Sequence, residues 1–359
     1  MRALWGYLLL IGLGLLIAVY ISFQSFFTSF GFNLPKDEEQ IGMKDQIVIK
    51  FSHVVAENTP KGLAANRFAQ LVDEYTDHRV KIEVYPNQSL YSDHEEIEAL
   101  QENKVQMIAP TTSKITSISK KWMLLDLPYV FPTDAALQEA LNGEVGEELL
   151  KQLNTIDIEG LAFWSNNYKQ ITSSKPIRHP SDFAGKNFRI MPSAVLESQF
   201  NHFGATTSQL EFNETFKSLE INETDSQENT ISNIYSKKLY EVQKYLTISD
   251  HGYLGYVVMI NKPFWNKLPL DIQQQIQRAM DDTTKWLWIK SNELNQEQLK
   301  EIQQKSNIDI YKLSDEEKKE WMDEMTVIYP EFESTIGTEL MTKMEKIREK
   351  HLKDSENTH

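Results

Sequence analysis

The sequence predicts an α/β protein with two lobes, and three observations indicate this class. Short β-rich runs alternate with helical periodicity from residue 46 onward, which is typical of a largely parallel sheet covered by helices. The strand pattern breaks near residues 165–167 and then starts again. A long helical segment without internal proline or glycine follows in the C-terminal third. We therefore expect two α/β lobes and one helix long enough to reach both.

Strands and helices alternate in each expected lobe. In the first lobe the predicted strands cover 46–52, 80–86, 105–110 and 158–164, and the predicted helices cover 61–75, 93–103 and 134–153. In the second lobe the predicted strands cover 169–173, 186–191 and 205–210, with a helix over 194–203. The two lobes are thus expected to have a similar layout.

The C-terminal third is predicted to be helical. Residues 269–304 could form one helix of roughly 50 Å at 1.5 Å per residue, with Trp286 and Trp288 as packing residues. A lone amphipathic helix is marginal in water, so this one should lie across both lobes or along a partner. The alternative is a break near Thr283 and Thr284. Two surface helices are expected over 315–325 and 339–352.

Composition limits the partners and the chemistry. The 359 residues carry a formal net charge of −15 at pH 7, so we expect no nucleic-acid partner, and an anionic ligand needs locally placed cations. The chain has no cysteine, which excludes disulfides, thiol catalysis and cysteine-ligated zinc. It has no P-loop, Gly-x-Ser-x-Gly or His-Glu-x-x-His pattern, and its eight histidines are scattered. We therefore expect neither an enzyme nor a metal or cofactor protein.

The N-terminal segment predicts an extracytoplasmic protein attached to the cell membrane. Residues 3–23 carry no charge, and about 20 apolar residues span a bilayer as a helix. Arg2 is the only positive charge before this segment, which predicts that the remainder faces the extracytoplasmic side. We expect a membrane anchor over 1–24 and a linker over 25–45. The alternative is a cleaved signal segment, which would leave a secreted protein.

Polar segments follow several expected strands, at the positions where α/β sheets bind ligands. "FSHVVAENTPKG" follows the first strand, "APTTSK" follows the third, and "FWSNNYKQ" lies at the expected lobe boundary. The second lobe adds "NFRIMPS" and "DSQENTISNIY". Two lobes that offer such segments to one crevice predict a binding protein.

The chain from Phe188 to Pro269, and above all its block "QENTISNIYSKKLYEVQKYLT", resembles the extracytoplasmic solute-binding proteins of TRAP transporters, the DctP-type dicarboxylate-binding family. The resemblance covers residues 46 to about 329. "FSHVVAENTPKGLAANRFA" and "APTTSK" are most similar to the Bacillus-type C4-dicarboxylate branch. The resemblance implies a two-lobed periplasmic-binding-protein (Venus-flytrap) fold with a long helix bridging the lobes. It also implies capture of succinate, fumarate or malate by lobe closure.

The expected organisation follows from these features. Lobe I is expected over 46–165 and about 253–285, lobe II over 166–252 and about 286–350, and a tail over 351–359. The expected partners are a small dicarboxylate and the membrane permease subunits of a dicarboxylate transporter. The alternative is a co-receptor that presents the dicarboxylate to a sensor histidine kinase, and an enzyme acting on organic acids is a third class.

The resemblance also implies site residues. The family's carboxylate-binding arginine falls on Arg189, its ligand-facing asparagine on Asn229, and its aromatic position beneath the ligand on Phe212. A supporting first-lobe acid falls on Glu95. Many members have a second arginine where this chain has Lys169, which supplies a point charge rather than a planar fork.

A second carboxylate needs its own donors, because an unpaired buried charge costs several kcal/mol. The expected donors are His53, Lys61, Ser113 and Lys114, with assistance from Lys169. Asn58, Thr59 and Trp164 are expected to shape the pocket.

The run from Asp225 to Tyr235 contains another departure from the family pattern. A glycine of that pattern is replaced by Ser226, so either the backbone needs no positive φ there or Ser226 is mildly strained. Asp225, Gln227 and Glu228 are expected to order the loop and cap a following helix. Asn229 is the member of the run that is expected to reach the ligand.

Overall fold

The computed structural model describes residues 46–356, so the expected anchor and linker lie outside the described residues. No helix within 46–356 is long and apolar enough to cross a membrane. The strands are β1 (Ile47–Ser52), β2 (Val80–Tyr85), β3 (Met107–Ile108), β4 (Ile158–Ser173), β5 (Asn187–Ile190), β6 (Thr206–Gln209), β7 (Ser226–Asn229), β8 (Tyr245–Asn261) and β9 (Asp309–Lys312).

The helices alternate with these strands and then dominate the C-terminal third. The α-helices are α3 (Pro60–Tyr75), α4 (Glu96–Gln101), α5 (Asp134–Leu141), α6 (Glu144–Leu153), α7 (Ala194–His202), α8 (Thr215–Glu220), α9 (Ile231–Ser236), α10 (Leu239–Val242), α11 (Lys262–Trp265), α12 (Leu270–Lys305), α13 (Asp315–Met325), α14 (Tyr329–Ile336) and α15 (Thr338–Glu356). Short 3₁₀ helices are η1 (Thr112–Ser117), η2 (Lys120–Asp126), η3 (Asn154–Ile156), η4 (Pro180–Phe183) and η5 (Thr326–Ile328).

The strands form one mixed sheet, which confirms the α/β class. Its order is β2-β1-β3-β8-β4-β7-β5-β6, and β9 pairs with β8. The outer neighbours β1–β2, β1–β3, β5–β6 and β5–β7 are parallel, as predicted. The two long central strands, β4 and β8, are antiparallel to each other, so the expectation of a largely parallel sheet is wrong at the centre. β8 pairs with β3 near one end of this central pair, and β4 pairs with β7 near the other end.

The predicted strands over 158–164 and 169–173 are a single strand, β4. The apparent break between them is a bulge, where the register with β8 shifts between Ser165 and Tyr168. Asn167 has a φ of 81° at the bulge, a backbone region that asparagine tolerates better than most residues. A bulge interrupts the periodic pattern without ending the strand, which is why the pattern alone suggested two strands.

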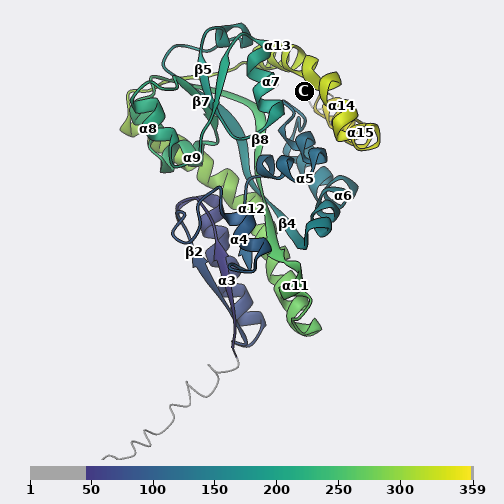
Figure 1. Ribbon diagram of the computed structural model, residues 1–359. Helices are drawn as coiled ribbons and strands as arrows, with labels where there is room; N and C mark the ends of the chain where they lie inside the picture. The colour runs from purple at the N-terminus through teal and green to yellow at the C-terminus, as the bar shows by residue number, and fades with distance from the viewer. Residues whose placement is uncertain (1–45, 357–359) are drawn as a thin grey trace, which may run out of the picture. The chain divides into compact units, whose positions relative to one another are not determined.

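The long C-terminal helix is confirmed as α12, which has 36 residues and is therefore about 54 Å long. It packs against α3, β4 and α9, and Figure 1 shows it running between the part of the fold that contains α3 and the part that contains α9. The alternative of a break at Thr283 and Thr284 is wrong. Both hydroxyls donate to the carbonyl oxygen four residues earlier, at 2.7 and 2.8 Å, so the helix accommodates them.

Three other predicted elements differ from the structure. The helix expected over 134–153 is divided into α5 and α6, because Gly143 is extended and begins α6. Gly146 packs so closely on this turn that a Cβ there would lie 2.0 Å from the carbonyl oxygen of Leu141. The third strand is only β3, and the helix expected over 93–103 is shortened to α4. The two surface helices are confirmed as α13 and α15.

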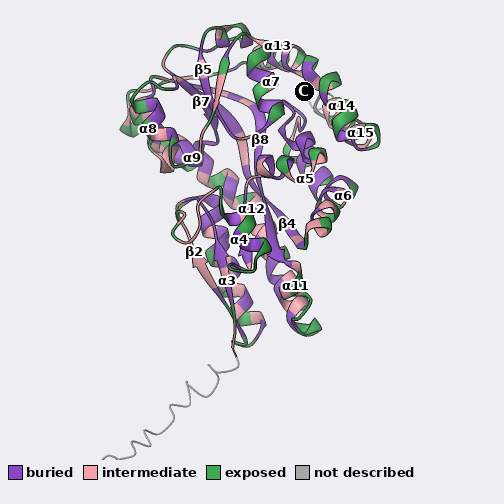
Figure 2. Cartoon of the chain, in the orientation of Figure 1, coloured by how far each residue is buried: buried purple, intermediate pink, exposed green. Residues whose placement is uncertain are grey.

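Buried residues are concentrated in the central strands and on the inner sides of the helices, as Figure 2 shows. A polar group within this interior joins three elements. Asn166, at the β4 bulge, donates through Nδ2 to Thr230 at 2.9 Å and to the Tyr256 hydroxyl at 3.0 Å, and accepts from Ser232 at 2.9 Å. The amide therefore fixes the start of α9 against β4 and β8.

Asn166→Ala is expected to lower the free energy of unfolding by about 2–3 kcal/mol, because three buried hydroxyls lose a partner together. Urea denaturation of the two proteins measures this difference. Replacement of Gln274, an exposed residue of α12, by alanine is the control and should change stability by less than about 0.5 kcal/mol. Equal effects of the two substitutions would contradict the role of Asn166.

Candidate functional site

A cavity lies where the loops after β1 and β3 meet β5, the β7–α9 junction and β8. Its empty space, including the part open to solvent, is about 380 Å³. Its lining residues are Val54, Val55, Asp93, Thr111, Lys114, Arg189, Met191, Pro192, Phe212, Asn229, Asn233, Leu254 and Tyr256. Of the twelve site residues predicted from sequence, Arg189, Asn229, Lys114 and Phe212 are in this lining.

Arg189 supplies a buried cation to the cavity. It lies on β5, only 2 % exposed, and its Nε and Nη2 both donate to the carbonyl oxygen of Leu210, at 3.0 and 2.6 Å. Burial lowers the pKa of Arg189 to about 10, while nearby acids oppose the shift, so the guanidinium remains charged at neutral pH. No carboxylate within residues 46–356 forms an ion pair with it. The cavity therefore contains a positive charge with no directly bonded counter-ion.

Asn229 is held with its amide nitrogen free. It ends β7, and its Oδ1 accepts from the backbone N–H of Thr230 at 3.2 Å and from Nδ2 of Asn233 at 2.7 Å. These bonds fix the side chain. The Nδ2 of Asn229 has no acceptor within the described part of the chain, so it can donate to an oxygen in the cavity.

Lys114 and Asp93 form an ion pair at the other side of the lining. The Nζ of Lys114 lies 2.6 Å from Oδ1 of Asp93, and the two side chains are 10 % and 12 % exposed. Lys114 also donates to the backbone carbonyl of Asp93. The buried hydroxyl of neighbouring Thr111 has no hydrogen-bond partner among residues 46–356. This wall thus offers an unused hydroxyl and a lysine that is already paired with Asp93.

The remaining lining is largely apolar. Phe212 packs with Val54 and Val55 in a small buried cluster, and Nζ of Lys237 lies 4.9 Å from the centre of the Phe212 ring. Tyr256 lies on β8 and accepts from Asn166. Apolar walls around a few polar groups are typical of small-molecule sites, because they exclude water from the polar contacts.

Two predicted donors lie just behind the lining rather than in it. Lys61 is completely buried, with Nζ 2.8 Å from the carbonyl oxygen of Ala109 and 3.9 Å from the centre of the Tyr256 ring. His53 is also buried, and neither ring nitrogen has a hydrogen-bond partner among the described residues. Burial, and then Lys61, lower the pKa of His53 to about 3, so this imidazole is neutral.

The other predicted first-lobe residues stabilise neighbouring elements instead of lining the cavity. Ser113 donates to Asp126 at 2.5 Å, Thr59 caps the start of α3 through the N–H of Gly62, and the Trp164 indole donates to Thr284 at 3.1 Å. Glu95 is exposed and accepts from the backbone of Ser92. Asn58 is exposed on the loop before α3.

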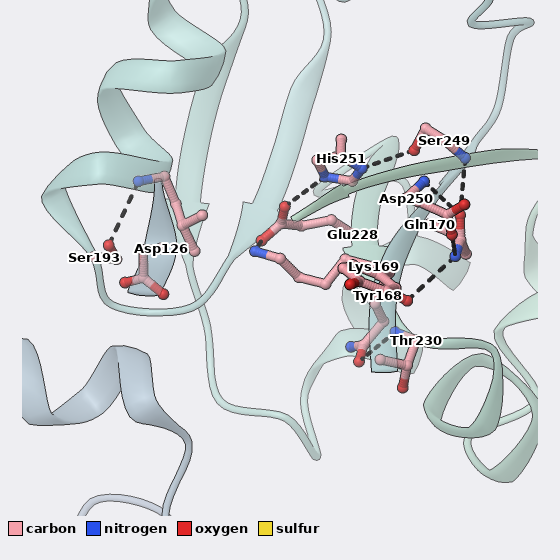
Figure 3. A network of polar contacts seen from close by, with 12 residues as sticks. Asp126, Tyr168, Lys169, Gln170, Ser193, Glu228, Thr230, Ser249, Asp250 and His251 are labelled. Carbon is pink, nitrogen blue, oxygen red and sulfur yellow. Dashed lines mark hydrogen bonds and ion pairs between the residues drawn. The ribbon is translucent and has the colours of Figure 1, made fainter. Parts of the chain in front are cut away.

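Lys169 belongs to a buried network next to the cavity (Figure 3). Its Nζ lies 2.6 Å from Oε1 of Glu228, and Nε2 of His251 lies 2.9 Å from Oε2 of the same carboxylate. The other ring nitrogen of His251 lies 2.7 Å from Oγ of Ser249. Burial acts to raise the pKa of Glu228, but Lys169 and His251 outweigh it and hold this pKa at about 2. The predicted ligand donor Lys169 is thus already paired.

The expectation that Gln227 and Glu228 cap a helix is wrong. Both lie within β7, where Gln227 donates to Thr172 at 2.9 Å and Glu228 binds Lys169. Asp225 orders the preceding turn, since its Oδ1 accepts from Ser226 at 2.8 Å. Ser226 has no positive φ, so the backbone does not need glycine there.

Sequence reasoning missed most of the apolar lining and the polar residues Asp93, Thr111 and Asn233. Asn233 follows Asn229 by four residues at the start of α9, and this spacing was the available signal. Asp93 could be placed only once the loop before α4 was seen to fold over Lys114.

A family model described as "Bacterial extracellular solute-binding protein, family 7" matches residues 51–335. The chain belongs to this family. The C4-dicarboxylate-binding protein DctB of Bacillus subtilis is 48 % identical over 349 residues, which are 97 % of this chain and 99 % of that protein. The C4-dicarboxylate-binding periplasmic protein DctP of Rhodobacter capsulatus is 40 % identical over 298 residues, 83 % of this chain and 90 % of that protein.

Solved structures of TRAP periplasmic solute binding proteins have the same fold. One from Sulfurospirillum deleyianum, with bound succinate, has a TM-score of 0.81 and 38 % identity, and the match covers 84 % of this chain and 99 % of that one. One from Pseudomonas aeruginosa, with bound L-malate, has a TM-score of 0.76 and 36 % identity, covering 79 % and 99 %.

Lys169→Met and Glu228→Gln are each expected to lower the free energy of unfolding by about 3–5 kcal/mol, because each leaves a buried group without its partner. The double variant should lose less than the sum of the two losses. Chemical denaturation measures all three differences. Lys217→Met, in an exposed ion pair with Glu220, is the control and should cost less than about 1 kcal/mol.

Acid titration tests the direction of the pKa shift of Glu228. The Glu228 carboxylate stabilises the fold above its usual pKa of 4.5, and this contribution is lost as the pH falls toward about 2. Glu228→Gln should therefore remove part of the acid sensitivity of the protein. Additive losses in the variants, or unchanged acid sensitivity in Glu228→Gln, would contradict the assignment of this pair.

Proposed function

We propose that this protein is an extracytoplasmic solute-binding protein that captures C4-dicarboxylates such as succinate, fumarate and malate. The observation that carries the proposal is Arg189, a buried cation in the cavity that has no ion-pair partner among residues 46–356. A ligand carboxylate supplies that partner, and the planar guanidinium can bind its two oxygens together. Asn229 donates to the same carboxylate through its free Nδ2.

The second carboxylate of the ligand binds at the opposite wall. Lys114 and Thr111 are the donors in the lining there, and Lys61 adds positive charge from behind Tyr256. Phe212 and the two valines cover the carbon chain of the ligand. The names of DctB and DctP, and the succinate and L-malate in the related structures, support a C4-dicarboxylate as the ligand.

Binding is proposed to close two lobes over the ligand. In the proposed division, 46–165 and about 253–285 form lobe I, and 166–252 and about 286–350 form lobe II. Two contacts cross this division next to the lining residues Asp93 and Phe212: His94 lies 3.3 Å from Glu211, and Asn213 donates to Gln88 at 3.2 Å. A ligand that contacts both lobes favours the closed state by its differential affinity, and α12 links them.

The closed protein then delivers its ligand to the permease subunits of a TRAP transporter, and residues 1–24 attach it to the membrane from the extracytoplasmic side. This role needs no catalytic chemistry, so the protein is proposed to act as a binding protein and not as an enzyme. Presentation of the dicarboxylate to a sensor histidine kinase stays the alternative. Purification of the membrane complex that forms with ligand distinguishes a permease from a kinase partner.

Arg189→Ala is expected to abolish binding of succinate, fumarate and malate, because the buried ion pair with the ligand is lost. Arg189→Lys should also bind far more weakly, since a lysine lacks the planar fork. Isothermal titration calorimetry measures both affinities. Arg79→Ala, at a half-exposed arginine that pairs with Asp271, is the matched control and should bind as the wild type does. Unchanged affinity in Arg189→Ala with the fold intact would contradict the proposed site.

A further inference from the structure

Glu96 is an acid whose surroundings do not suit a charged carboxylate. It opens α4, is completely buried, and neither carboxylate oxygen has a hydrogen-bond partner within residues 46–356. An ionised carboxylate in such a position loses its hydration without compensating donors. The geometry therefore favours the neutral carboxylic acid.

The cation that most strongly favours its ionised form, Lys61, does not form an ion pair with it. Lys61 has its Nζ bound to the carbonyl oxygen of Ala109 at 2.8 Å and placed 3.9 Å over the Tyr256 ring. Tyr256 is in the cavity lining, so Lys61 lies directly behind that wall. Lys61 and Glu96 are both completely buried, and each charge acts on the other group. Burial, opposed by the Lys61 charge, raises the pKa of Glu96 from 4.5 to about 8. Burial lowers the pKa of Lys61 to about 8.

Other titratable groups lie around this pair and the cavity. Asp93, in the loop before α4, disfavours ionisation of Glu96, whereas Lys114 on η1 favours it. His53, after β1, is neutral because burial lowers its pKa to about 3. Across the cavity, Arg189 is the cation of β5. Asp93 and Lys114 neutralise each other as an ion pair, so the charge behind the wall depends on Lys61 and Glu96.

We propose that Glu96 is a specificity-determining residue of the cavity: it stays a neutral acid beside charged Lys61, so the pair adds one positive charge that favours dianions over monoanions. The inference rests on the proposed function and deepens it. A positive charge attracts a dianion about twice as strongly as a monoanion at the same distance. Ionisation of Glu96 cancels this charge and weakens dicarboxylate binding.

The proposal fixes the direction in which the affinity for succinate changes with pH. Above about pH 7 a C4-dicarboxylate is already a dianion, so further changes in affinity come from the protein. As the pH rises through about 8 the pair loses a proton, and the affinity for succinate falls. Binding of a dianion opposes that loss, so succinate binding near pH 8 takes up part of a proton.

Glu96→Gln tests the proposal, because glutamine imitates the neutral acid and cannot ionise. We expect the full chain with Glu96→Gln to bind succinate as tightly as wild type near pH 7, and both proteins to bind it more weakly near pH 9, because Lys61 itself loses its charge near pH 8. Titration calorimetry with succinate, and with butyrate as the C4 monoanion, measures the affinities. The fall in affinity between the two pH values should be smaller for butyrate than for succinate. Glu98→Gln, exposed on the same helix, is the control and should follow wild type at both pH values.

Thermal unfolding gives a readout that is independent of ligand. Between about pH 4.5 and pH 8 the folded protein holds the Glu96 proton that the unfolded chain has lost, so wild-type stability falls as the pH rises. Glu96→Gln should lack this fall and have the higher Tm near pH 8. If the variant does not fold, proton uptake by the wild type still tests the proposal, by calorimetry in two buffers of different ionisation enthalpy.

The results that would contradict this inference can be told apart from those that would contradict the proposed function. Binding of succinate that is more than about threefold tighter in Glu96→Gln than in wild type near pH 7 would show that Glu96 is ionised there and would overturn the inference. An affinity for succinate that does not fall between pH 7 and 9, or no proton uptake by wild type near pH 8, would also overturn it while leaving the proposed function intact. Failure of the wild type to bind any C4-dicarboxylate would overturn the proposed function and this inference together.

Discussion

The guanidinium of Arg189 is a buried charge without an ion-pair partner in the part of the chain that the structure describes. Two of its nitrogens converge on one backbone carbonyl, that of Leu210, which fixes the side chain without neutralising it. Such an arrangement is costly in an empty protein and becomes favourable when an anion arrives. The rest of the site depends on keeping this charge available.

The Lys169–Glu228–His251 network has a clear part in that arrangement. Gln227 is paired with Arg189 across β5 and β7, and Glu228 is the next residue of β7. In the strand pairing, the carboxylate of Glu228 is therefore the acid next to Arg189. Because Glu228 is bound by Lys169 and His251, it does not form an ion pair with Arg189. The network also anchors β7, whose last residue is Asn229. Lys169 therefore stabilises the strand that carries Asn229, a proposed ligand donor.

Local sequence signals were sufficient for much of the fold. Absence of proline and glycine predicted the 36-residue α12, and β-rich runs located β1, β2 and β5. The continuity of β4 could not be predicted, because a bulge at Asn167 breaks the periodic pattern while β8 maintains the pairing. The split of α5 from α6 depends on the tight approach of Gly146 to Leu141, which is a tertiary contact.

The site was predictable to a smaller extent. Arg189, Asn229, Lys114 and Phe212 were expected and line the cavity, whereas the wall formed by Tyr256 and Leu254 arises only when β8 is placed beside β3 and β4. Two acids at the start of α4 illustrate the limit of prediction from sequence. Sequence pointed to Glu95, but the next residue, Glu96, is the buried acid, since one position turns a helical side chain by about 100°.

The most direct test of the account is a crystal structure of the protein with succinate bound. The account predicts one carboxylate within hydrogen-bond distance of both the Arg189 guanidinium and Nδ2 of Asn229, and the other beside Lys114 and Thr111. Succinate bound elsewhere, or held in the cavity with neither carboxylate on Arg189, would contradict it.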